Sequence, residues 1–201
     1  MEALLSQTKP ASTLPLSKRL KIATHTAHEQ VDKAIMALSP FTSLDGYRRF
    51  LSVQYQFQRH TAPLYEQPDL CKQLMRLEQR CRFNSVILDI NDLSIKTEEL
   101  NVSPIPPPTV GSQAAALGWL YVNEGSNLGA AFLLKYASQL GLSAHFGARH
   151  LAPSDAGRGL HWRLFIAQLD AISLSEEQER QAIKGARDAF TFVESLALNN
   201  H

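Results

Sequence analysis

Apolar residues recur at steps of three and four along nearly the whole chain, and this period limits the possible folds more than any other feature. No alternating pattern longer than a few residues indicates a β-strand. The first apolar stripe, which stops before Pro40, consists of Leu20, Thr24, Ala27, Val31, Ala34, Ile35 and Leu38. The sequence therefore predicts an all-α protein.

Caps and helix breakers divide the rest of the chain into further helices. A second helix is expected after Thr42-x-x-Asp45, which has the spacing of a capping box, and Pro63 should end or kink it. A third is expected over residues 69–86, before a proline-rich connector at residues 94–112. The remaining helices are expected over residues 113–140, over residues 161–172 after a loop at residues 141–159, and from the cap Ser175-x-x-Gln178 onward.

The length of 201 residues favours one domain, and we expect a tail at residues 1–16 and a single helical domain at residues 17–198. A net charge of +1 gives no global field that would hold nucleic acid or an anionic membrane surface. The longest apolar run, residues 114–122, is shorter than the roughly 20 residues that span a bilayer. There is no charged start of a secretion signal, and two cysteines build no disulfide framework. We therefore expect a soluble, cytoplasmic protein, and a monomer.

A glycine segment, Gly125-Ser126-Asn127-Leu128-Gly129, lies inside the long expected helix. Each glycine there costs about 1 kcal/mol against alanine. Gly125 and Gly129 are one turn apart and share a face, which therefore carries no side chain over that turn. Either another helix packs closely on this face, or something flat approaches the backbone. Glycine with serine also favours a kink.

His28 lies at the edge of the first apolar stripe, one turn after Thr24, whereas His25 points further toward the polar side. Lys21 lies two turns earlier on nearly the same face, roughly 10 Å away. This spacing fits a porphyrin, which has its iron at the centre and its carboxylates at one rim. Imidazole binds haem iron, lysine can pair with a propionate, and Asp32 can orient the imidazole through its other nitrogen. For an isolated histidine, the alternative is a partly buried ring bonded to water or a carbonyl.

His28 and the glycine segment together predict a plate-like cofactor between two helices. A second protein ligand opposite His28 would close the iron, as in electron-transfer haem proteins. A glycine backbone opposite His28 instead leaves the sixth position open to a small ligand such as O₂.

Three segments resemble the bacterial biliverdin-producing haem oxygenases: residues 28–32 (His-Glu-Gln-Val-Asp), the glycine-rich residues 118–132, and residues 147–153 (Gly-Ala-Arg-His-Leu-Ala-Pro). The likeness covers nearly the whole chain. It implies a multi-helical haem oxygenase fold with haem between a proximal helix and a kinked distal helix. Haem would be both substrate and prosthetic group. O₂ and electrons from an external reductase or ferredoxin would convert it to biliverdin, CO and ferrous iron.

The resemblance also assigns roles by position. His28 corresponds to the proximal iron ligand, and Thr24 belongs to the same haem-binding surface. Lys21 and Tyr121 look like the pair that holds the propionates. Relatives that open the α-meso position keep a basic residue on the first helix and a tyrosine on the distal helix, so this pair predicts α-biliverdin.

On the distal side, Gly125, Ser126 and Gly129 correspond to the helix face against which O₂ binds. A hydrogen-bonded network that includes waters is implied at the positions of Gln54, Arg82 and Asn84. Some relatives carry an acid where this chain has Asn84, so the resemblance leaves the route of proton delivery open here.

Two other functions would use the same features. A non-catalytic haem protein for storage, transport or sensing would use the same His28 and pocket, and a helical scaffold without haem would use the glycines only for packing. None of the remaining histidines has the spacing of a zinc or di-iron site. We expect His150 and Trp162 to tie their loop to a neighbouring helix by hydrogen bonds.

Overall fold

The structure, a computed structural model, describes residues 14–96, 100 and 106–200, and within these residues every regular element is helical. The all-α prediction is therefore confirmed, whereas most of the expected tail lies outside the described residues. The α-helices are α1 (Leu16–Ala37), α2 (Leu44–Thr61), α3 (Pro68–Gln73), α4 (Phe83–Asp92), α5 (Gln113–Ala137), α6 (Arg158–Ala171) and α7 (Glu176–Leu198). Short 3₁₀ turns are η1 (Ala62–Glu66), η2 (Glu78–Arg80), η4 (Ser138–Leu140) and η5 (Arg149–Leu151).

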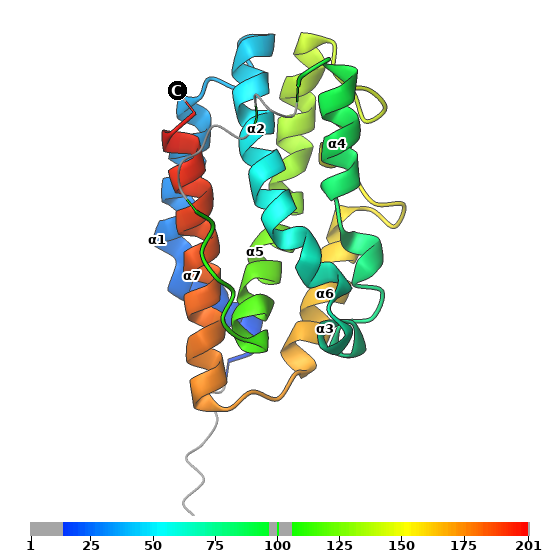
Figure 1. Cartoon of the computed structure of the whole chain (residues 1–201). Coiled ribbons are helices and arrows are strands. Elements are labelled where there is room, and N and C mark those ends of the chain that lie inside the picture. The colour runs from blue at the N-terminus through cyan, green and yellow to red at the C-terminus, as the bar shows by residue number, and fades with distance from the viewer. Residues whose placement is uncertain (1–13, 97–99, 101–105, 201) are drawn as a thin grey trace, which may run out of the picture.

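Helix α7 is the centre of the packing, because both α1 and α5 lie along it and all three helices run in the same direction (Figure 1). Two glycines bring α5 and α7 into backbone contact. A Cβ added to Gly118 would overlap the carbonyl of Ala182, and a Cβ added to Gly185 would overlap the backbone of Ala115. Helices α5 and α7 therefore approach each other more closely than larger residues at these positions would allow.

The third predicted helix, over residues 69–86, is wrong. The chain forms α3, then η2, then α4, because Leu74 is extended and Arg76 has a positive φ of 60°. Leu70, Leu74 and Leu77 are nevertheless all buried. The spacing of these leucines correctly indicates that they are buried. A short helix followed by turns buries them as well as one long helix would.

The helix caps agree with the sequence in part. α2 is capped by Ser43, whose Oγ accepts from the Gly46 N–H at 3.1 Å, and not by Thr42 as predicted. Thr42 instead donates its hydroxyl to the carbonyl of Ser39 at 2.9 Å. The capping box of Ser175 on α7 is confirmed. α6 begins three residues earlier than predicted, at Arg158.

The long helix predicted over residues 113–140 is confirmed. α5 stays α-helical through the glycine segment, and η4 continues it to Leu140. As predicted, α2 ends just before Pro63, and the connector at residues 94–112 forms no long helix where it is described. None of the described helices is both long and apolar enough to cross a membrane.

Candidate haem site

His28 lies on the exposed side of α1, and its ring meets the ring of Phe190 on α7 edge to face, at 5.5 Å between centroids. Its side chain is 60% exposed, which is more than its predicted position at the edge of the apolar stripe implies. Nδ1 lies 3.2 Å from Oδ2 of Asp32. His25 has the opposite arrangement, with Nε2 at 3.5 Å from Glu29. His28 is therefore the histidine of α1 that can offer Nε2 to a metal while a carboxylate orients its other nitrogen.

The face of α5 that carries Gly125 and Gly129 is open. Gly118, Gly125 and Phe132 follow one another at steps of seven residues, about two turns, and so lie on one side of the helix. A Cβ on Gly125 would meet only the ring of Trp162, at 3.6 Å, and a Cβ on Gly129 would meet nothing within 4 Å. Phe132 is 69% exposed. Helix packing therefore accounts for Gly118, whereas the face beyond it is free for a flat ligand.

The two walls border the same stretch of α7. Gly118 packs on Ala186, and one turn further along α7 Phe190 contacts His28. Two turns further along α5 lies Gly125. Helices α1 and α5 both pack against α7 and make few direct contacts with each other. The helix that carries the imidazole and the helix that carries the bare backbone thus pack against the same stretch of α7, an arrangement that fits a flat ring with a metal at its centre.

Thr24 is buried one turn before His28. Its hydroxyl donates to the Leu20 carbonyl at 2.8 Å within the same helix. The hydroxyl of Thr24 is therefore already used by the backbone.

Asp170 of α6 relates the helix turn that precedes Lys21 to the surroundings of Tyr121. Asp170 of α6 accepts from the backbone N–H and the hydroxyl of Ser17, at 2.7 and 2.8 Å. Lys21 lies one turn beyond Ser17 and is exposed. Burial, and secondly the charge of Asp170, raise the pKa of Tyr121, whose ring lies 5.5 Å from that of Trp162. An ammonium group and a protonated phenol are suitable partners for carboxylates.

A small cavity of about 50 Å³ adjoins the glycine segment at Ser126. Gln54 from α2 and Arg82, which precedes α4, line it together with Ser126, so the structure brings these three predicted residues together. Asn84 does not join them, because it is exposed on the first turn of α4 and does not line this cavity. The other lining residues are Phe50, Gln58, Asn127, Ala130, Leu133, His150 and Leu151.

The loop on the far side of this cavity is clamped from two directions. Arg82 donates to the carbonyls of His150 and Ala152, at 2.6 and 2.8 Å. Burial lowers the pKa of Arg82. Asp89 of α4 accepts from the backbone N–H groups of Arg149 and His150, at 2.8 and 2.9 Å. These bonds fix the cavity wall to α4.

A buried ionic cluster holds α5 immediately before the glycine segment. Glu124 lies 2.6 Å from Arg80, accepts from the hydroxyl of Tyr65 at 2.9 Å, and lies 3.2 Å from Nε2 of His161. Burial and the Glu124 charge hold the pKa of Tyr65 well above its usual value, so its phenol stays a donor. This cluster ties α5 to η1, η2 and α6.

Asn123 provides the second fixation of α5. Its amide accepts from Gln58 at 2.7 Å and donates to Thr61 at 2.9 Å, both on α2. Asn123 and Glu124 together set the rotation of α5 about its axis. They therefore determine where the face of Gly125 points.

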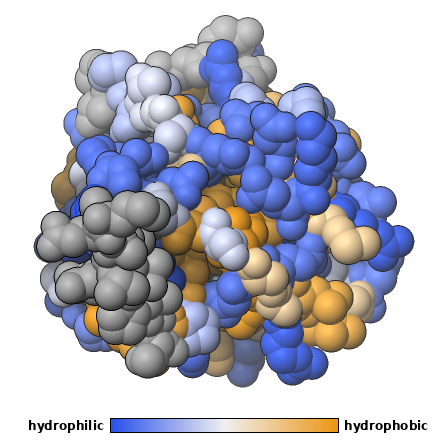
Figure 2. All heavy atoms as spheres, turned by 90° about the horizontal axis from the view of Figure 1, so that it is seen from below, coloured by the Kyte–Doolittle hydropathy of each residue, from blue (hydrophilic) through white to orange (hydrophobic). Residues whose placement is uncertain are grey.

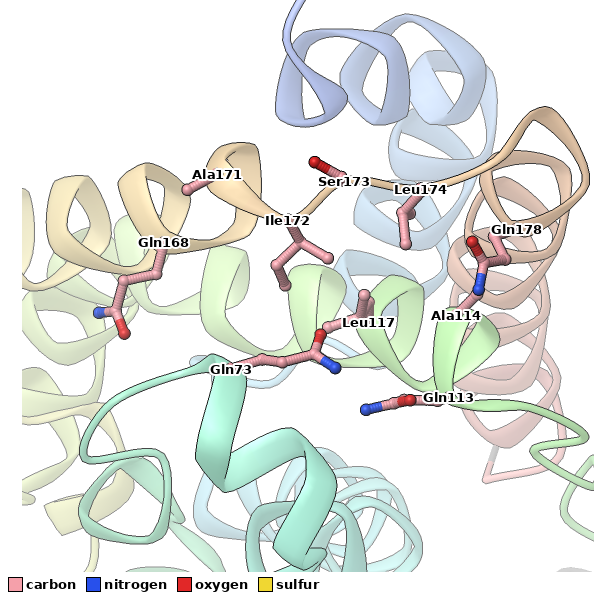
Figure 3. Close-up of a pocket in the computed structure, with 10 residues that line it drawn as sticks. All are labelled: Gln73, Gln113, Ala114, Leu117, Gln168, Ala171, Ile172, Ser173, Leu174 and Gln178. Atoms are coloured by element: carbon pink, nitrogen blue, oxygen red, sulfur yellow. The ribbon is translucent and has the colours of Figure 1, made fainter.

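A larger cavity lies elsewhere, at the end of the molecule where α5 and α7 begin. It measures about 410 Å³. Figure 2 shows this end with apolar surface at its centre and a hydrophilic surround, and Figure 3 shows glutamines around an apolar floor. Its lining residues are Gln73, Gln113, Ala114, Leu117, Gln168, Ala171, Ile172, Ser173, Leu174 and Gln178. It has no histidine, cysteine or charged group to hold haem, and Gln113 lies three turns, roughly 18 Å, from Gly125 along α5.

Comparison with known proteins agrees with this geometry. The sequence model of the family described as heme oxygenase matches residues 14–198. The heme oxygenase PigA of Pseudomonas aeruginosa is 43% identical over 174 residues, which cover 87% of each chain. The crystal structures of the NO- and CO-bound heme oxygenase from Neisseria meningitidis match with a TM-score of 0.86 and 39% identity, covering 94% of this chain and 92% of that chain.

The chain therefore belongs to the haem oxygenase family, and it is a haem oxygenase. This confirms the resemblance and the fold that it implied. It also sets aside the non-catalytic haem protein and the scaffold without haem.

Sequence reasoning missed several residues that shape the site. Glu124 and Asp89 are buried carboxylates. The signal for Glu124 was its place two residues after the apolar run at residues 114–122. The expectation for His150 is confirmed, because its Nδ1 lies 2.7 Å from Asp89. For Trp162 it is wrong, because within the described residues its ring contacts Tyr121 and Phe165 but makes no hydrogen bond.

Proposed function

We propose that this haem oxygenase binds its substrate haem between His28 and the bare face of α5. O₂ and electrons from an external reductase or ferredoxin then open the ring to α-biliverdin, CO and ferrous iron. The observation that carries the proposal is an imidazole oriented by Asp32 and a glycine face that border the same stretch of α7. The Neisseria relative, described as NO- and CO-bound, supports it, because a haem that binds such small ligands keeps one position open.

Haem supplies the iron that binds O₂ and the ring that is opened. His28 would hold the iron through Nε2, and Asp32 would keep the hydrogen on Nδ1. The face at Gly125 and Gly129 lets the ring lie against the backbone and admits a diatomic ligand but no protein ligand. The polar cavity beside Ser126 supplies hydrogen bonds without an acidic side chain.

The α isomer follows from how the ring is rotated about the iron. The Lys21 ammonium and the Tyr121 hydroxyl would bind the two propionates at the junction of α1 with α6, and this contact fixes one rotation. The α-meso carbon would then face the glycine segment. Lys21→Ala combined with Tyr121→Phe should turn part of the product into β- or δ-biliverdin.

The electron donor is proposed to dock on the side of α1 that carries the site. Lys18 and Lys21 are exposed there, and the side chain of His28 is itself largely exposed. A donor with an acidic surface would be steered to this side, more weakly as salt is added.

Single turnover of the haem-loaded protein with a ferredoxin-type reductase tests this function. We expect loss of the Soret band, release of iron and CO, and a bilin that chromatography identifies as the α isomer. A Soret band that survives reductant and O₂ would show a carrier and overturn the proposal. If the product were mainly β- or δ-biliverdin, only the proposed rotation of the haem would be overturned, and the proposed function would stand.

A further inference from the structure

One wall of the distal cavity carries a buried imidazole whose second nitrogen has no protein partner. His150 is 4% exposed and lines the cavity, and its Nε2 bonds to none of the described residues. Its Nδ1 lies 2.7 Å from Oδ2 of Asp89, a carboxylate with no exposed surface. Because a carboxylate accepts hydrogen bonds, Nδ1 carries the hydrogen, and in the neutral ring Nε2 is the acceptor.

The orientation of this ring is strongly fixed. Asp89 accepts from the backbone N–H of His150 as well as from its ring, and Arg149 Nη1 lies 3.5 Å from Asp89 Oδ1. The ring of Phe50 covers the imidazole, with centroids 5.8 Å apart. Nε2 therefore cannot turn away to find another partner.

Two side-chain amides line the same cavity. Neither the amide of Gln54 nor that of Asn127 makes a hydrogen bond with the described residues, and each can both donate and accept. A cavity of about 50 Å³ has room for an ordered water, which needs two to four polar partners. His150, Gln54 and Asn127 provide three.

We propose that His150, oriented by Asp89, holds an ordered water in this cavity and positions it beside the glycine face of α5. The water donates one O–H to Nε2 and accepts from the Gln54 or Asn127 amide. Its second O–H is then turned toward Ser126 and the bare face. His150 is a positioning residue, because it acts through this water and does not touch the substrate.

The catalytic role of this water rests on the proposed function, since the water serves catalysis only if haem lies against α5. The arrangement gives the bare face a hydrogen-bond donor from a cavity that no acidic side chain lines. Rotating or removing the imidazole would leave the water with fewer partners and a less defined orientation.

Nuclear magnetic resonance on the haem-free chain tests the geometry independently of haem. Nitrogen-15 shifts should show His150 with its hydrogen on Nδ1, and the ring Hε1 should show a nuclear Overhauser effect to bound water. A hydrogen on Nε2, or a ring without contact to water, would overturn the proposal. The outcome does not depend on His28, so failure here is distinct from failure of the proposed function.

Variants then test the consequence. We expect His150→Phe to keep haem affinity, to release O₂ from the ferrous protein about tenfold faster and to slow ring opening about tenfold, the effect of one lost hydrogen bond. His150→Gln should recover most of both rates because its amide can accept from the water. His60→Phe is the matched control, since His60 lies between Trp119 and Phe192 and away from the cavity.

Unchanged O₂ release in His150→Phe, or equal damage from Phe and Gln, would contradict a water-positioning role. If His150→Phe lowers the melting temperature so far that it does not fold, the resonance experiment on the unmodified chain still decides.

Discussion

Asp32 and His28 lie one turn apart on α1, with Oδ2 of the carboxylate 3.2 Å from Nδ1 of the imidazole. The neighbouring pair, Glu29 and His25, joins through Nε2 at 3.5 Å. Similar local chemistry thus gives opposite results. In the His28–Asp32 pair Nε2 is left free for a ligand, whereas in the His25–Glu29 pair Nε2 faces the carboxylate.

Asp32→Asn should weaken the proximal ligand without removing it. A carboxylate partner raises the basicity of a ligating imidazole, and its loss typically costs about 10–100-fold in metal affinity or activity. Asp32 is exposed, so solvent screens part of this effect and we expect about tenfold or less in turnover. Single-turnover rates measure it, with Glu29→Gln as the control. Equal loss in both variants would contradict the assigned role of Asp32.

Gly129→Ala and Gly118→Ala should separate activity from stability. Ala at position 129 meets no neighbour and favours the helix by about 1 kcal/mol, so the melting temperature should not fall, while the narrowed distal face should lower O₂ binding and turnover. Ala at position 118 overlaps the Ala182 carbonyl and should cost about 1–3 kcal/mol of the free energy of unfolding. Thermal melts and single turnover would measure both. A Gly129→Ala protein with full activity would contradict a ligand at that face.

The sequence was sufficient for the helical class and for placing His28 and the glycine segment on helices, because both depend on local spacing. The stripe of α1 and the glycine step of α5 are each set within a few residues. The sequence was insufficient to predict that the helix ends before Leu74, because Leu74 is buried there without being helical.

Long-range pairing was also beyond the sequence. Glu124 and Arg80 are far apart along the chain, and nothing local indicates that they meet. The same holds for Asp89 and His150. Asn84, a position matched by resemblance, lies outside the cavity that Gln54 and Arg82 share, and its role in the distal network stays a prediction.

Glu124→Gln should destabilise the fold strongly. Glu124 has no exposed side-chain surface, and removing its charge leaves Arg80, itself buried, without a counter-ion. Breaking a buried pair in this way costs about 3–5 kcal/mol. Denaturant unfolding would measure this loss. Glu177→Gln, which removes an exposed partner of Arg180, is the control and should leave the free energy of unfolding nearly unchanged, because solvent screens this pair. Similar losses in both variants would show that the Glu124 cluster does not hold α5.

Stability should fall in mild acid because of His60. Burial between Trp119 and Phe192 lowers the pKa of this imidazole, and a backbone bond with Pro108 opposes the shift only in part. Below a pH of about 6.5 the unfolded chain therefore binds a proton that the folded chain resists. The stabilisation is complete above that pH and is lost as the pH falls through the lower folded pKa.

His60→Phe should make the melting temperature less sensitive to acid across this range. His145→Phe, at an exposed position, should leave the sensitivity unchanged. If the melting temperature of His60→Phe depended on pH as strongly as that of the unmodified protein, another group would be responsible for the loss of stability in acid.

The most direct test of the central claim is resonance Raman spectroscopy of the ferrous haem-loaded protein. His28→Ala should still take up haem but lose the iron–histidine stretching band and turnover, and added imidazole should restore part of both. His25→Ala should keep the band and the activity. A band that persists in His28→Ala, or that disappears in His25→Ala, would contradict ligation of haem by His28.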